Sequence, residues 1–410
     1  MDAAYSYSPH IEATAAPPIP LAGLWAKEYS PTPSEPLLNL AQGVPGDPPP
    51  QELLQKLAEA SADPSTTGYG GLRGDIGLRK ELARDINQVY GCQAGGNPVD
   101  GEKDLVITSG CNLAFYAAML ALARQGDEVI VPTPWYFNHE MILTQLGVTL
   151  VPLRCAPPAF LPSVADAAKL IRPGKTKAIV LVTPNNPTGA VYPPELLREF
   201  ADLAEREKLP LVLDETYREF IEGRPHELFA ETEWRKYLIH LFSFSKSYAI
   251  PGHRLGALAA SPSFLTQVDK LLDCLQICPV RPAQRAVEWA VEATRPWREA
   301  TRGKLARRQE LFREMVREVD GWEVETGGGY FAYVKHPFPG ASSELVASRL
   351  GALVGVVLLP GTFFSPPFED VNDDRFIRFS IANVSEDILR QVPSRLRKLN
   401  AIWPSLDQQK

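Results

Sequence analysis

One lysine near the middle of the chain has the sequence setting of a nucleophile. Lys246 lies in "SFSKSYAIPGHRLGA" (residues 243–257), at the end of the apolar run "YLIHLFSF", which reads as a buried strand. A buried lysine is rare unless it is paired or used in chemistry. Lys246 is therefore either an incidental surface charge at the end of a strand or a reactive amine.

Polar groups follow other strand-like runs. "LPLVLDE" ends at Asp214, with Tyr217 three residues later, and "VTPNNPTG" leaves a strand through Asn186. In "VITSGCNLAFYAAML" a buried strand runs into Gly110 and a helix begins directly after it. The free N–H groups and the dipole of such a helix N-terminus favour a phosphate. Taken singly, each of these segments also reads as an ordinary turn or helix cap.

The elements that position these groups alternate between strand and helix. Short β-branched runs alternate with amphipathic helices, which predicts an α/β fold: a large domain with a mostly parallel sheet flanked by helices. The expected strands are 104–108, 128–132, 148–153, 177–184, 209–215, 237–244 and 256–261. The expected helices are 112–126, 137–147, 164–171 and 193–208.

The pattern changes after the sheet. A helical stretch over 282–319 is expected to lead into a smaller α+β C-terminal domain. Its predicted strands are 321–335, 354–361 and 375–382, and its predicted helices are 342–352 and 385–399. Residues 1–50 are rich in proline and alanine and predict an extended arm with little regular structure, contributing to the small domain. The expected domains are thus this arm, a large domain over 51–290 and a small domain over 291–410.

Composition excludes several classes of protein. The chain has 410 residues, 45% of them hydrophobic, and a formal net charge of -7. Neither disorder nor nucleic-acid binding is expected from these values. Five scattered cysteines without a CxxC pattern predict neither disulfides nor a metal site. No run of about 18 apolar residues and no signal-like N-terminus occur, so we expect a cytoplasmic protein without membrane contact.

The polar strand ends become informative together. Carboxyl ends of parallel strands meet at one edge of a sheet, where ligands bind. A phosphate cradle, an amide, a carboxylate and a lysine would then share one crevice. This set suits pyridoxal 5′-phosphate, whose phosphate needs a helix N-terminus, whose ring nitrogen needs a carboxylate and whose aldehyde needs a lysine.

Five ordered segments carry a resemblance to a known family. They are "GYGGLRGDIGLRKELA", "TPNNPTG", "DETY", "SFSKSYAIPGHRLG" and "RFSIAN". With them the chain resembles fold-type I pyridoxal-phosphate enzymes of the class I and II aminotransferase group, from about Gly43 to the last helix. The resemblance implies an aspartate aminotransferase-like fold and exchange of an amino group between an L-amino acid and a 2-oxo acid.

The resemblance also implies roles at the cofactor ring. Lys246 would hold the cofactor as a Schiff base and move the proton at the substrate α-carbon, kept neutral by nearby cations such as Arg254. Asp214 would pair with the ring nitrogen, and Tyr217 and Asn186 would bind the phenolic oxygen. Lys246, Asp214 and Tyr217 are thus the implied catalytic residues. His139 stands at a family-like position without an assigned role.

Other implied contacts hold the phosphate and the substrate. Tyr136 would stack on the ring, and Tyr69 would reach the phosphate of a neighbouring subunit, which makes a homodimer part of the prediction. Arg378 would pair with the substrate α-carboxylate, helped by Gly43 and Asn186. The implied phosphate contacts are Gly110, Cys111, Asn112, Ser243 and Arg254.

The same constellation supports other reactions. A carbon–sulfur lyase or an elimination like that of aminocyclopropane-carboxylate synthase is the second reading. A non-catalytic pyridoxal-phosphate-fold binding protein is the third, and it is disfavoured because the lysine, the aspartate and both arginines are present. The side chain of the amino acid substrate has no sequence signal.

Overall fold

A seven-stranded sheet forms the centre of the larger part of the molecule. The computed structural model describes residues 5–92, 97–371 and 373–407. The strand order is β2-β8-β7-β6-β5-β3-β4, and all neighbours are parallel except those of β8. The predicted, mostly parallel sheet is therefore confirmed. Its strands are β2 (Leu105–Thr108), β3 (Glu128–Thr133), β4 (Thr149–Arg154), β5 (Thr176–Val182), β6 (Leu211–Asp214), β7 (Leu238–Ser243) and β8 (Gly256–Ala259).

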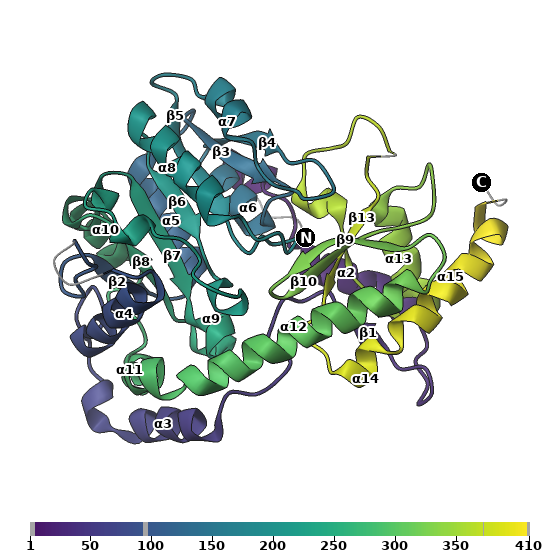
Figure 1. The fold of residues 1–410 in the computed structure, drawn as a ribbon, viewed down its shortest axis with the longest axis horizontal. Coiled ribbons are helices and arrows are strands. Elements are labelled where there is room, and N and C mark those ends of the chain that lie inside the picture. Colours follow the sequence, from purple (N-terminus) through teal and green to yellow (C-terminus); the bar gives the residue numbers. More distant parts are fainter. Residues whose placement is uncertain (1–4, 93–96, 372, 408–410) are drawn as a thin grey trace.

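Helices cover both faces of this sheet (Figure 1). Leu211 and Leu213 of β6 pack into one apolar core with α4, α8 and α11, whereas Val212 packs into another with α5, α6 and α10. This alternation follows from the two-residue period of a strand. The helices are α3 (Gln51–Ala62), α4 (Ile76–Val89), α5 (Cys111–Leu122), α6 (Phe137–Gln145), α7 (Val164–Leu170), α8 (Pro194–Glu207), α9 (Phe244–Ser247), α10 (Pro262–Leu275) and α11 (Arg281–Ala293).

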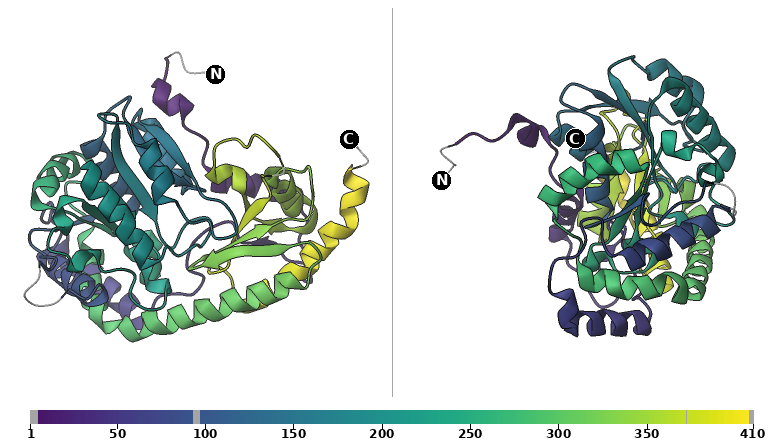
Figure 2. Two further views of the ribbon diagram at one scale, coloured as in Figure 1. Left: turned by 45° about the horizontal axis from the view of Figure 1, so that its top comes forward. Right: turned by 90° about the vertical axis from the view of Figure 1, so that its left-hand side faces the viewer.

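A smaller antiparallel sheet lies in the C-terminal part. Its strand order is β12-β13-β10-β9, and it shares an apolar core with α12, α13 and α15. Figure 2 shows α12 running from the larger part along the smaller one. These elements are α12 (Arg295–Arg317), β9 (Glu323–Gly328), β10 (Phe331–Lys335), α13 (Ser343–Val354), β12 (Leu359–Pro360), β13 (Phe376–Ser380), α14 (Glu386–Leu389) and α15 (Val392–Asp407).

Two predicted elements in this region are wrong in detail. The expected single strand over 321–335 is a hairpin of β9 and β10, because Gly329 adopts a positive φ of 53° and reverses the chain. The expected helical stretch over 282–319 is divided at Thr294 into α11 and α12. Pro296 lies in the first turn of α12, where its missing N–H costs nothing.

The N-terminal arm is more regular than its composition predicts. The composition of residues 1–50 predicts a largely extended segment, yet this segment contains α1 (Pro9–Ala13), α2 (Pro18–Trp25) and β1 (Leu38–Asn39). Proline can begin these helices because an N–H group in the first helical turn has no partner within the helix, so its absence costs nothing. α2 packs on α13, and β1 pairs in parallel with β11 (Val356–Val357). The domain boundaries at residues 50 and 290 stay a prediction.

Candidate active site

The carboxyl ends of five strands of the large sheet surround one cavity. β2, β3, β5, β6 and β7 lead into the segments that carry Cys111, Tyr136, Asn186, Asp214 and Lys246, respectively. The cavity has a volume of about 350 Å³. Of the predicted site residues, it is lined by Gly43, Cys111, Asn112, Tyr136, Asn186, Asp214, Tyr217, Ser243, Lys246, Arg254 and Arg378.

Lys246 lies on α9, the short helix that directly follows β7. The hydroxyl of Tyr330 donates a hydrogen bond of 3.3 Å to its main-chain oxygen, which ties the helix to the C-terminal part. Burial first, and then the charges of Arg254 and Arg378, lower the pKa of Lys246 from 10.5 to about 8. A substantial share of this amine is therefore neutral near physiological pH.

Asp214 has a partner at each carboxylate oxygen. Thr216 donates to Oδ1 from its hydroxyl at 2.7 Å and from its main-chain N–H at 3.0 Å. His139 Nε2 lies 3.2 Å from Oδ2, and both side chains are buried. A carboxylate acceptor requires Nε2 to carry the proton. The ring of His139 also stacks on Phe115, with 3.9 Å between the ring centroids, so the acid is held in one orientation.

The N-terminus of α5 forms an open anion cradle. The helix begins after Gly110, which has a φ of 88° and provides no side-chain cap. A Cβ at this position would collide with the guanidinium of Arg254, so glycine is needed for that close approach. Ser243 lies buried at the end of β7 and its hydroxyl accepts a hydrogen bond from Ser245 N–H at 3.3 Å. The free N–H groups of α5 and the cation of Arg254 suit a phosphate.

Arg378 is buried on β13 and points away from the apolar core. Its neighbours Ile377 and Phe379 pack into that core, because successive side chains of a strand point to opposite faces. Nη1 donates to Asn186 Oδ1 at 2.7 Å, and Nη2 donates to the main-chain oxygen of Ala41. Within the described ranges its buried Nε has no partner. Burial lowers the pKa of Arg378 to about 10, so the guanidinium remains charged at neutral pH.

Two tyrosines and a glycine complete the wall. Burial raises the pKa of Tyr136 to about 12 and that of Tyr217 well above its usual value, so both phenols are neutral. Tyr136 accepts a hydrogen bond from Asn138 Nδ2 at 2.8 Å. A Cβ at Gly43 would lie 2.6 Å from the ring of Phe331, so the chain can pass there only as glycine.

Two predicted residues stand apart from the cavity lining. Gly110 shapes the turn beneath Arg254. Tyr69 is 80% exposed and lies outside the cavity in the single chain. Sequence reasoning missed Ser245 and Thr216, each of which stands beside a predicted residue in "SFSKS" or "DETY". It also missed the lining residues Ile19, Gln42, Val44, Phe137, Val182 and Pro251.

The lowered pKa of Lys246 predicts how its reactivity varies with pH. Only the neutral amine is nucleophilic, so its rate of acetylation by acetic anhydride should rise with pH and reach half its maximum near 8. Competitive labelling of protein without added cofactor, followed by mass spectrometry of the Lys246 peptide, measures this midpoint. In Arg254→Leu the midpoint should move upward because a cation that opposes protonation is lost. A wild-type midpoint near that of an ordinary lysine, about 10.4, would contradict the assignment.

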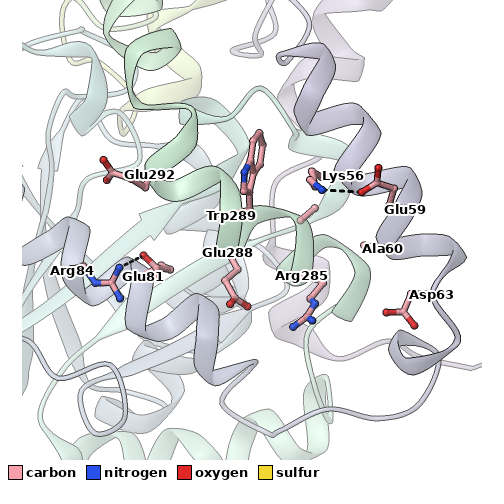
Figure 3. A pocket seen from close by; sticks show the side chains of 11 residues that line it. Lys56, Glu59, Ala60, Asp63, Glu81, Arg84, Arg285, Glu288, Trp289 and Glu292 are labelled. Atoms are coloured by element: carbon pink, nitrogen blue, oxygen red, sulfur yellow. Dashed lines mark hydrogen bonds and ion pairs between the residues drawn. The ribbon is translucent and has the colours of Figure 1, made fainter.

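A second groove lies away from this cavity, between α3, α4 and α11 (Figure 3). Ion pairs line it, with Lys56–Glu59 at 3.0 Å and Arg84–Glu81 at 2.8 Å. Such partly exposed pairs are screened by solvent and contribute little to stability. None of the predicted site residues lines this groove.

Neither a metal-binding cluster nor a membrane-spanning helix occurs within the described ranges. No group of three or more histidine, cysteine, aspartate or glutamate side chains there is arranged to hold a metal ion. In the same part of the chain, every helix is too short or too polar to cross a membrane.

Known proteins resemble this chain over nearly its whole length. A family model described as aminotransferase class I and II matches residues 35–396. The aromatic aminotransferase ISS1 of Arabidopsis thaliana is 28% identical, covering 88% of this chain and 89% of that protein. The valine–pyruvate aminotransferase of Mycobacterium tuberculosis is 31% identical, with coverage of 90% and 92%. Among solved structures, aspartate aminotransferase from Thermus thermophilus with maleate has a TM-score of 0.85 and 26% identity, covering 96% and 100%.

Proposed function

Because the chain belongs to the class I and II aminotransferase family, we propose that it moves the α-amino group of an L-amino acid to a 2-oxo acid, with pyridoxal 5′-phosphate bound at Lys246. Aminotransferase activity follows from the family and from relatives named as aromatic, aspartate and other aminotransferases. The observation that carries the proposal is one cavity that joins a lysine, an acid and a buried arginine beside an uncapped helix N-terminus.

The residues around the cavity fit this cofactor. The uncapped start of α5, with Arg254 over the Gly110 turn, offers N–H groups and a cation to its phosphate. Asp214 would keep the ring nitrogen protonated, and Tyr217 would donate to the phenolic oxygen. Asn186 also suits that oxygen, because its Oδ1 is engaged by Arg378 and its NH₂ group is the remaining donor.

The remaining implied contacts are proposed with the same cofactor. Tyr136 would stack on its ring. The N–H groups of Cys111 and Asn112, at the start of α5, would bind its phosphate together with the hydroxyl of Ser243.

Different side chains of the cavity would carry out the separate steps of transamination. When bound, the cofactor supplies an electron sink for the electrons released at the substrate α-carbon. Lys246, neutral in part near pH 8, takes the α-proton and returns it. Arg378 holds the α-carboxylate with its guanidinium, whose buried Nε has no partner within the described residues. The main chain at Gly43 lies beside this group and would help to orient the carboxylate.

A single-turnover experiment tests the reaction type. The purified protein with pyridoxal 5′-phosphate is mixed with a panel of L-amino acids and no 2-oxo acid. Transamination predicts one equivalent of pyridoxamine phosphate and one of 2-oxo acid per active site, and a second 2-oxo acid should restore the starting form. Continuous release of ammonia or thiol would instead support the elimination readings. If no amino acid gives either result, the non-catalytic binding protein is favoured.

We also propose a homodimer in which Tyr69 contacts the cofactor phosphate of the partner subunit. Tyr69 lies on a loop held by a second segment: Gly70 N–H bonds Cys278 Sγ at 3.4 Å, and Arg281 Nη1 bonds the main-chain oxygen of Ser65 at 2.6 Å. In and beside that second segment, Leu275, Ile277 and Val280 are each nearly half exposed. Exposed apolar side chains around an exposed tyrosine support a protein interface here.

A mixed dimer tests the role of Tyr69. Lys246→Ala and Tyr69→Ala each impair both sites of their own homodimer, but in a mixed dimer the two defects would fall in the same site if Tyr69 acts across the interface. One site carries both changes and the other carries neither, so mixing the two proteins under exchange conditions should restore activity above that of either parent. Mixing Lys246→Ala with Arg378→Ala is the control. Each of these changes affects the site of its own subunit, so both sites of this mixed dimer are defective although Tyr69 is intact in both subunits. If the Tyr69→Ala mixture recovers no more activity than this control, Tyr69 does not act across the interface.

A further inference from the structure

The cavity has an apolar wall built from distant parts of the chain. Ile19 of α2 and Phe137 of α6 both line it. They belong to one apolar cluster that also contains Ala41, Leu359 and Phe364. α2 packs on α13 and on β12, so Ile19 reaches the cavity as part of a packed layer and not as a free terminal arm.

This wall adjoins the group that would bind the substrate carboxylate. The guanidinium carbon of Arg378 lies 4.6 Å from the ring centroid of Phe331 and 5.1 Å from that of Phe364. Nη2 of Arg378 donates to the main-chain oxygen of Ala41, another member of the cluster. A carboxylate bound to Arg378 is therefore next to aromatic and aliphatic surface.

Each charged group that lines the cavity already has a proposed role toward the cofactor or the substrate α-carboxylate. Its cations are Lys246, Arg254 and Arg378, and its acid is Asp214. The other lining side chains from the described residues are neutral. A carboxylate or ammonium on the substrate side chain would lose its water here without gaining a partner of opposite charge from this subunit, which is unfavourable.

Resting on the function proposed above, we infer that this aminotransferase selects amino acids with apolar side chains, such as leucine, methionine and phenylalanine. Once the α-carboxylate binds Arg378 and the amino group faces Lys246, the side chain is the remaining large substituent, and Ile19 and Phe137 provide its apolar contacts. These two residues are thus specificity-determining, and dicarboxylic amino acids are poor substrates.

Steady-state kinetics test the preference. With a fixed 2-oxo acid, kcat/KM for leucine or phenylalanine should exceed that for aspartate and glutamate by about 100-fold or more. Ile19→Ala should lower kcat/KM for leucine by about 10-fold and change that for alanine by less than about twofold, since alanine lacks the contacting carbons. Leu24→Ala is the matched control, because Leu24 lies on the same helix and is 49% exposed.

A gain of function and a binding measurement separate this inference from the proposed function. Ile19→Lys should raise kcat/KM for aspartate relative to leucine by about 10-fold or more, because it adds the missing counter-charge. Calorimetry with 4-methylpentanoate and succinate, which carry no amino group, compares the two side-chain classes without turnover. Tighter binding of 4-methylpentanoate supports the inference even if no amino acid is converted, in which case the proposed function alone fails. Preference for aspartate together with tighter binding of succinate overturns the inference and leaves transamination standing.

Discussion

Lys246→Ala should lower kcat by about 10⁴-fold or more, because the chain loses both the amine that would hold the cofactor and the base at the substrate α-carbon. Among the described residues, no other lysine lines the cavity. Alanine also removes a buried cation that the charges of Arg254 and Arg378 disfavour, so the fold should tolerate the change. The loss is therefore expected in chemistry and not in stability.

Borohydride reduction provides the direct measurement. After incubation with pyridoxal 5′-phosphate and reduction, the wild-type Lys246 peptide should carry the cofactor's mass, and Lys246→Ala should carry no stoichiometric label. Lys246→Arg is a matched variant, since it keeps the charge and the length but cannot become a neutral nucleophile. Lys270→Ala, on the exposed side of α10, is the control that should behave as wild type. An equal yield of reduced cofactor in wild type and Lys246→Ala would rule out this assignment.

Asp214→Asn should lower kcat by about 10³-fold with a nearly unchanged melting temperature. The amide oxygen can still accept the hydrogen bonds from Thr216, and the amide NH₂ group can donate to His139 Nε2 when the proton of that ring moves to Nδ1, so the local structure should persist. The amide carries no negative charge, however, and cannot keep a proton on the cofactor's ring nitrogen. Binding is therefore retained while the electron sink is weakened.

Spectroscopy separates these two effects for Asp214→Asn. Titration with pyridoxal 5′-phosphate should still give a bound visible band, and single-turnover rates with an amino acid should be slow at saturation. Asp166→Asn is the control, because Asp166 pairs with Lys169 at the surface and does not line the cavity. A rate within tenfold of wild type would show that Asp214 does not set the state of the ring nitrogen.

Local sequence patterns were sufficient to predict much of the large sheet. In β6, leucine and valine alternate between two cores, and both faces are covered, so the strand reads as an apolar run in the sequence. Lys246 and Asp214 were recognisable because each follows such a run directly. The hairpin at Gly329 was missed, because apolar residues on both sides of three glycines resemble one long strand.

The N-terminal arm shows where composition misleads. Proline-rich sequence predicted extended chain, but proline is compatible with the first turn of a helix, and α2 is stabilised by packing on α13. Nothing local in "PPIPLAGLW" indicates that Ile19 lines the same cavity as Lys246, which lies more than 200 residues later in the sequence. That position depends on contacts between the two ends of the chain.

By itself, the sequence determined the fold class, the family-like motifs and the identity of the residues that can react, because these depend on side-chain chemistry and short-range periodicity. The tertiary structure alone decided which of them meet and in what environment. His139 lies against Asp214, Arg378 bonds Asn186 and Ala41, and burial among cations lowers the pKa of Lys246. Distances, desolvation and electric fields arise from packing between remote segments, and no local pattern encodes them.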